Sequence, residues 1–139
     1  MLLFFVCSSA FVLTLISFVH FYWLFGGRRG LNAVLPEKVE GGKSFSPRWI
    51  ETLIVALGLL VVALILLIQY DLILFFQPNM FTKLFCIIFT FVFLMRAIGD
   101  FKHLGIFKKV KHTTFSKYDT RLYNPLCLYL ALTFTFAWS

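Results

Sequence analysis

Residues 53–70 read LIVALGLLVVALILLIQY, and this stretch decides the fold. It contains no charged side chain, and its length approaches the roughly 20 apolar residues that a helix needs to cross a bilayer. Trp49 precedes this stretch and Tyr70 is its last residue, and both are at positions where the membrane surface favours aromatic side chains. We therefore expect a transmembrane helix over residues 49–70, with Glu51 as its one charged residue.

Three further runs are apolar and long enough to be spans. They cover residues 2–25, 80–101 and 122–138, and Pro125 falls early in the last run, where a helix tolerates proline. All four runs must be helices, because four isolated strands could not close a barrel and lipid cannot satisfy free backbone groups. The sequence predicts an all-α protein, with residues 1–139 forming a single membrane domain built as a four-transmembrane-helix bundle.

The overall composition also indicates a lipid environment. Of the 139 residues, 60% are hydrophobic and only 14% are charged. A soluble domain of this length has too little interior to bury so much apolar surface. The composition therefore excludes a disordered chain and a soluble enzyme.

Basic residues gather in the two long connections between spans. Residues 26–48 carry five Lys or Arg against two Glu, and residues 102–121 carry six against one Asp. The middle connection holds only Asp71 and Lys83. By the positive-inside rule, we expect two long cytoplasmic loops and both termini on the outer side. The net charge of +7 is then explained by the orientation of the spans in the membrane and by attraction to anionic lipid headgroups.

Binding to nucleic acid would need a soluble basic surface with base-reading elements, and we expect no such binding.

A small set of polar residues falls near the expected cytoplasmic boundary of the spans. In three helices, two such residues are three or four positions apart, and so share one helix face. Arg96 and Asp100 could form an ion pair, and Gly99 between them would allow another helix to approach closely. The candidate site residues are His20, Trp23, Arg96, Asp100, Asp119 and Tyr123.

Two interpretations of this cluster stay open. In the first, the residues hold the bundle together, and Arg96 is neutralised by Asp100 or Asp119. In the second, they line a cavity that opens to the cytoplasm, because an ionisable residue inside a membrane segment is by default a functional-site hypothesis. Arg96 would then bind an anionic or carbonyl group, and His20 or Asp119 would exchange a proton.

We expect no metal site and no cofactor. The chain has no phosphate-binding loop, dinucleotide fingerprint, zinc-protease motif or serine-hydrolase motif. His20 has no second histidine within a span with which to bind haem. Cys7, Cys86 and Cys127 all fall inside spans and form no C-x-x-C pair. A disulfide between Cys7 and Cys86 is geometrically conceivable, although buried thiols more commonly act as small hydrophobic groups.

Four short motifs carry a resemblance to a known family. They are HFYWLFGG at residues 20–27, GLNAVLP at 30–36, RAIGDF at 96–101 and DTRLYNPLC at 119–127. Together they resemble a family of small bacterial four-helix membrane proteins of unknown function, over nearly the whole chain. The resemblance implies a multi-pass protein of the bacterial cytoplasmic membrane, with no particular activity. Asn32 departs from the pattern, because an acidic residue is expected there.

Three classes of function are compatible with these observations. The favoured one is a helix bundle without catalytic activity that has a polar cluster at its cytoplasmic end. Its role would be structural, or it would bind a small ligand or a lipid. The alternatives are a small carrier or exporter that works as a homodimer, and an intramembrane enzyme acting on a lipophilic substrate. In the enzyme, His20, Asp100 or Asp119 would act as acid or base. The expected partners are membrane lipids, whose anionic headgroups would meet the basic loops.

Overall fold

The computed structural model describes residues 1–30, 48–99, 106–109 and 114–139, and within these ranges the chain is helical and contains no strand. The all-α prediction is therefore confirmed for the part of the chain that the structure describes. The helices are α1 (Leu2–Leu24), α3 (Trp49–Gln69), α4 (Met80–Ile98), α5 (Thr114–Tyr118), the π-helix η1 (Asp119–Tyr123) and α6 (Asn124–Trp138).

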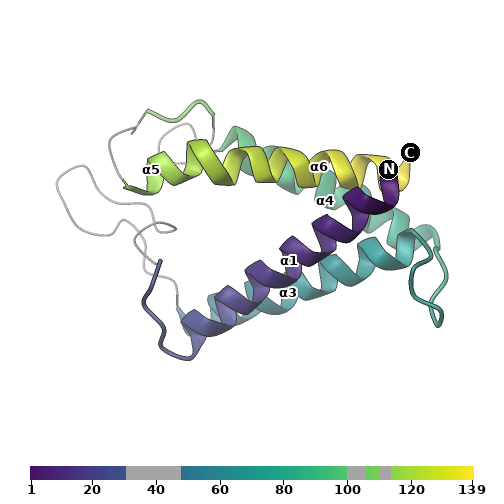
Figure 1. The fold of residues 1–139 in the computed structure, drawn as a ribbon, viewed down its shortest axis with the longest axis horizontal. Helices are drawn as coiled ribbons and strands as arrows, with labels where there is room; N and C mark the ends of the chain where they lie inside the picture. The colour runs from purple at the N-terminus through teal and green to yellow at the C-terminus, as the bar shows by residue number, and fades with distance from the viewer. Residues whose placement is uncertain (31–47, 100–105, 110–113) are drawn as a thin grey trace.

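The long helices form two antiparallel pairs. Helix α1 lies along α3, and α4 lies along α6, and most of the contacts between helices occur within these pairs. Figure 1 shows that the pairs meet near the two chain termini and diverge toward the opposite end. Helices α1 and α4 end there, and α3 and α5 begin there. The two basic connections therefore start from the same end of the protein, as the charge pattern predicts.

Three helices agree with the predicted spans. Helices α1, α3 and α4 are long and apolar enough to cross a membrane. Their bounds lie close to the predicted ranges 2–25, 49–70 and 80–101. Asn79 caps the start of helix α4, and its side-chain oxygen accepts hydrogen bonds from two backbone N–H groups of the first turn. Such a cap satisfies amide groups that have no partner within the helix.

Gly99 follows the last residue of helix α4 and caps it, with a φ of 79°. Side chains disfavour this left-handed backbone region, so glycine is the usual residue for ending a helix in it. The backbone conformation at the end of α4 therefore explains the glycine at position 99. The predicted close approach of a neighbouring helix is not needed to explain it. Residues 100 and 101, which the predicted span included, lie outside the described residues.

The fourth helix differs from the predicted span over residues 122–138. Helix α6 has 15 residues, which at 1.5 Å each give about 22 Å, short of the roughly 30 Å of a bilayer core. It is not among the candidate spans of the described chain. The helical path begins earlier, at Thr114, and continues through α5 and η1 into α6. Hydropathy hides this start, because Lys117, Asp119 and Arg121 make the first turns polar.

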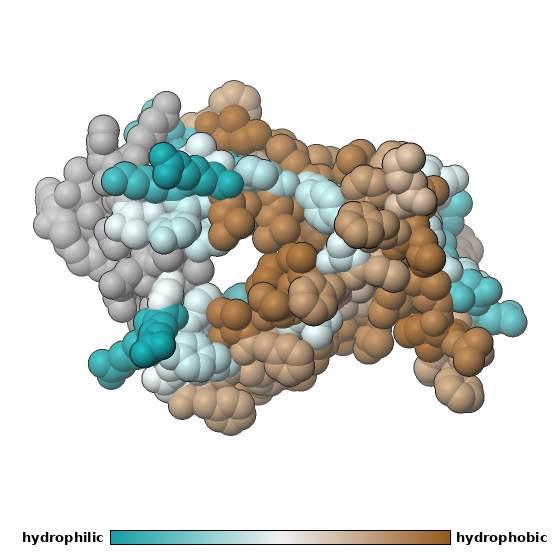
Figure 2. Space-filling model, viewed as in Figure 1, coloured by the Kyte–Doolittle hydropathy of each residue, from teal (hydrophilic) through white to brown (hydrophobic). Residues whose placement is uncertain are grey.

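Apolar side chains divide between a narrow core and a broad exposed surface. Phe134 is fully buried, and its ring lies 5.9 Å from that of Phe89 and 5.7 Å from that of Phe93, measured between centroids. Many other large apolar side chains are exposed, and Figure 2 shows them covering the middle of the molecule. The same view shows an opening between the two helix pairs where they diverge. This distribution is typical of a protein whose solvent is lipid.

Hydroxyl groups join the helices, which the sequence analysis did not anticipate. The hydroxyl of Ser17 donates to the carbonyl oxygen of Ala56 at 2.6 Å, and this bond links α1 to α3. Interhelical hydrogen bonds of this kind stabilise membrane bundles by roughly 1 kcal/mol each. Among the described residues, further hydrogen bonds that involve a hydroxyl group and join side chains of two helices are Ser8 with Tyr129, Ser9 with Thr133, Gln69 with Thr82, and Thr90 with Trp138.

The three cysteines do not form a disulfide. Cys7 is exposed, Cys86 is buried and Cys127 is partly buried, and all three are free thiols. The conceivable pair of Cys7 and Cys86 is therefore not formed, and Cys86 packs as a small apolar residue in the core.

Candidate functional site

The structure distributes the predicted polar residues over two places. Arg96 at the end of α4 and Asp119 at the start of η1 come together in one helix pair. His20 and Trp23 lie near the end of α1, in the other pair. In Figure 1 these two helix ends belong to the diverging arms. Asp100 lies outside the described residues.

Asp119 is the centre of the site. Its side chain is 0% exposed, and each carboxylate oxygen contacts a different cation. Oδ1 lies 3.0 Å from Nη2 of Arg96, and Oδ2 lies 2.7 Å from Nζ of Lys108. A carboxylate without partners would be very costly at this depth, and the two charge-assisted hydrogen bonds offset that cost.

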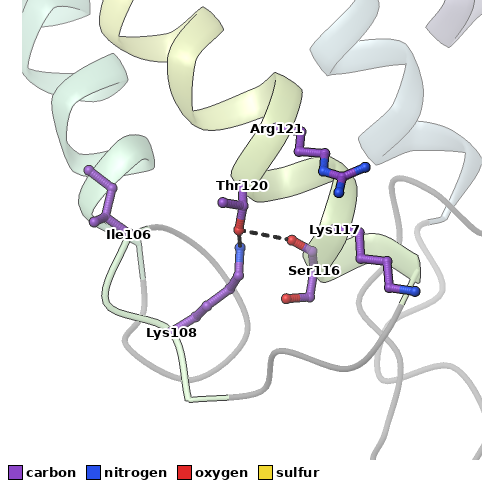
Figure 3. A pocket seen from close by; sticks show the side chains of 6 residues that line it. All are labelled: Ile106, Lys108, Ser116, Lys117, Thr120 and Arg121. Atoms are coloured by element: carbon purple, nitrogen blue, oxygen red, sulfur yellow. Dashed lines mark hydrogen bonds between the residues drawn. The ribbon is translucent and has the colours of Figure 1, made fainter.

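The two cations differ in their access to solvent. The side chain of Lys108 is 3% exposed, whereas that of Arg96 is 30% exposed. Lys108 also donates to the hydroxyl of Thr120 at 2.6 Å, and Thr120 in turn donates to the carbonyl oxygen of Ser116 at 3.1 Å. Figure 3 shows this chain of contacts. Asp119 and Lys108 therefore form a buried pair, and Arg96 closes it on the more open side.

Lys108 is a residue of this buried ion-pair cluster that the sequence did not predict. It is one of six basic residues in the second long connection, all of which were interpreted as a topology signal. Its burial depends on a partner on another segment, and helix periodicity says nothing about a residue in a connection. The only available hint was that Asp119 is the single acidic residue among these cations.

The π-helix explains how the chain places Asp119. Pro125 has no N–H group to bond to the carbonyl of Arg121, and its ring crowds that carbonyl in a regular α-helix. The wider turn of η1 relieves this crowding, and the N–H of Asn124 bonds to the carbonyl oxygen of Asp119. Single π-turns within helices often occur at functional sites. Here the wide turn carries the buried carboxylate.

Tyr123 lies at the end of the same wide turn. It is partly buried, and its ring packs against that of Phe115, with 6.1 Å between centroids. Phe115 belongs to α5 and is itself buried. Tyr123 therefore helps to fix α5 against η1, next to the ion pairs of Asp119.

His20 and Trp23 make local contacts. Their rings meet edge to face with centroids 5.1 Å apart, which confirms the shared helix face predicted from their spacing. Nδ1 of His20 lies 2.8 Å from the carbonyl oxygen of Ile16, and the indole N–H of Trp23 donates to the carbonyl oxygen of Arg29 at 2.8 Å. These contacts lie in and just after α1, whereas Asp119 lies on η1 in the other helix pair.

Two buried polar atoms at this end lack a hydrogen-bond partner among the described residues. They are Nη1 of Arg96 and Oδ1 of Asn124. A water molecule or a polar ligand atom would find an unused donor and an unused acceptor there. The described residues contain no group of three or more His, Cys, Asp or Glu side chains placed to hold a metal ion.

Comparison with curated proteins and with solved structures finds no match to this chain. A family model does match, and it covers residues 13–134, which include the second half of α1, the ion pairs around Asp119 and most of α6. The match agrees with the resemblance to an uncharacterised family, and it brings no assigned activity. The chain therefore belongs to the family described as protein of unknown function (DUF3995).

Proposed function

We propose that this protein is a multi-pass membrane protein with four spans. Helices α1, α3 and α4 are three of them. The fourth is the continuous helical path from Thr114 to Trp138, whose length of about 37 Å at 1.5 Å per residue is sufficient for a bilayer core. The polar first turns of this path, with Lys117 and Arg121, would lie at the headgroups, and α6 would lie in the hydrocarbon.

The proposed orientation puts both termini on the outer side of a bacterial cytoplasmic membrane. Its support is that the two basic connections start from one end of the molecule, and the termini lie at the other. Lys and Arg in short loops favour the cytoplasmic side.

The proposed role is that of a lipid-binding bundle whose polar end is a structural clasp. The observation that carries it is the complete pairing of Asp119, whose two oxygens are each held by a cation. Both oxygens are engaged by cations of the protein itself, whereas a general acid must direct its carboxyl group at a substrate. The opening between the helix pairs further supports lipid binding, because in a bilayer an acyl chain would fill it.

The topology is tested by labelling single cysteines in a variant in which the three native cysteines are replaced by serine or alanine. With a membrane-impermeant maleimide on intact cells, we expect labelling of Ser139→Cys at the C-terminus. Lys109→Cys is expected to react only after permeabilisation. Both positions are exposed, so a difference in reactivity reports the side of the membrane. Labelling of Lys109→Cys in intact cells, without labelling of Ser139→Cys, would reverse the proposed orientation.

A further inference from the structure

A pocket lies beside the clasp, between the segment that carries Lys108 and the helical turns of α5 and η1. Its volume is about 320 Å³, and it is partly open to solvent. Figure 3 shows the side chains around it. The lining residues are Ile106, Lys108, Ser116, Lys117, Thr120 and Arg121.

The pocket has an excess of positive charge. Lys108 is balanced by Asp119. Lys117 and Arg121 are both exposed, and neither forms an ion pair with any described residue. They are four residues apart on one helical path, so their charges lie on the same side of it, where they repel each other. An anion in the pocket would relieve this repulsion.

The donors suit a phosphate group in particular. The guanidinium of Arg121 can form two parallel hydrogen bonds to phosphate oxygens, and the ammonium group of Lys117 adds a mobile point charge. Lys108 is held in the wall by Asp119 and Thr120, so its position does not depend on a ligand. A site with one cation held in its wall and two exposed cations suits a compact anion with several oxygens.

Apolar side chains next to these cations indicate the source of the phosphate. Ile106, Phe107 and Leu122 are all exposed beside the basic residues. An anionic phospholipid would place its phosphate on the cations and the upper part of its acyl chains on these side chains, whereas free phosphate would use only the cations.

We propose that this pocket is a binding site for the phosphate group of an anionic membrane lipid. The inference rests on the proposed membrane location, because that location brings lipid headgroups to the pocket. It adds a defined site to the general attraction between basic loops and an anionic surface.

The test is lipid binding by the purified full-length chain in detergent, measured by native mass spectrometry. The probe is phosphatidylglycerol, with inorganic phosphate as a second arm. The double variant K117Q/R121Q is expected to bind phosphatidylglycerol at least about tenfold more weakly, because two charge-assisted contacts are lost. Arg121→Lys keeps the charge and loses the paired hydrogen bonds, so we expect a smaller loss.

The matched control is R28Q/R29Q, which removes two exposed cations at the same end of the protein, after α1. It should change binding by less than about threefold. Equal losses in the two double variants would mean diffuse attraction and would overturn the site. Binding of inorganic phosphate that K117Q/R121Q abolishes, without an effect on lipid, would assign the site to free phosphate. A reversed topology from cysteine labelling would refute the proposed orientation and leave this measurement unaffected.

Discussion

Replacing Asp119 with asparagine is expected to destabilise the protein by about 3–5 kcal/mol, because it leaves a buried cation without a counter-charge. Lys108 is almost completely buried and contacts Oδ2 at 2.7 Å. The amide of asparagine has one oxygen and one NH₂ group, so it cannot accept from Lys108 and Arg96 with two oxygens. Its NH₂ group would face one of the two cations. The measurement is thermal unfolding in detergent, followed by tryptophan fluorescence.

Asp71→Asn is the control for this change of charge. Asp71 is exposed, lies at the other end of the molecule and has a φ of 54°, a backbone conformation that asparagine tolerates. We expect its Tm to equal that of the unmodified protein. An unchanged Tm for Asp119→Asn as well would contradict the structural role of the ion pairs.

A double variant separates the two cations. Lys108→Met removes the buried cation and leaves the ion pair of Asp119 with Arg96 in place. In K108M/D119N the remaining charge, Arg96, is partly exposed and can reach solvent. We therefore expect the double variant to be more stable than the sum of the single changes predicts, by about 1–3 kcal/mol. Strict additivity would mean that Lys108 and Asp119 do not act as a pair.

The sequence predicts the helices of the apolar regions well, because their signal is local. Residues 53–70 and the run before Gly26 contain no charged side chain, and lipid leaves such segments no alternative to a helix. The common end of the two basic connections also follows from charge alone. The early start of the last helix does not, because its first turns are polar and become helical beside Lys108 and α4.

The candidate site is less predictable than the fold. Spacing along one helix correctly pairs His20 with Trp23. It cannot say which helix ends meet. The sequence therefore grouped these rings with Arg96 and Asp119, which the structure places in the other helix pair. It also could not find Lys108, because a connection has no period that relates it to a helix face. The pairing of Arg96 with Asp119 was one of two alternatives that the sequence left open.

The second large effect is expected at the apolar core. Phe134→Ala should lower stability by about 3 kcal/mol, because Phe134 is fully buried between the rings of Phe89 and Phe93. In a soluble protein part of this loss comes from the transfer of the ring out of water. In lipid or detergent that contribution is small, so the loss comes from the cavity and the missing packing contacts between α4 and α6. Thermal unfolding in the same detergent measures it.

Phe136→Ala is the matched control, since Phe136 belongs to the same helix and is exposed. Its truncation removes the same atoms from a surface that lipid or detergent can cover, so we expect a change of less than about 0.5 kcal/mol. The difference between the two variants isolates helix packing from the general effect of losing a phenyl ring. Equal destabilisation at the two positions would contradict the pairing of α4 with α6 through Phe134. A loss at Phe134 alone would show that this pair is held together by its apolar core as well as by the ions around Asp119.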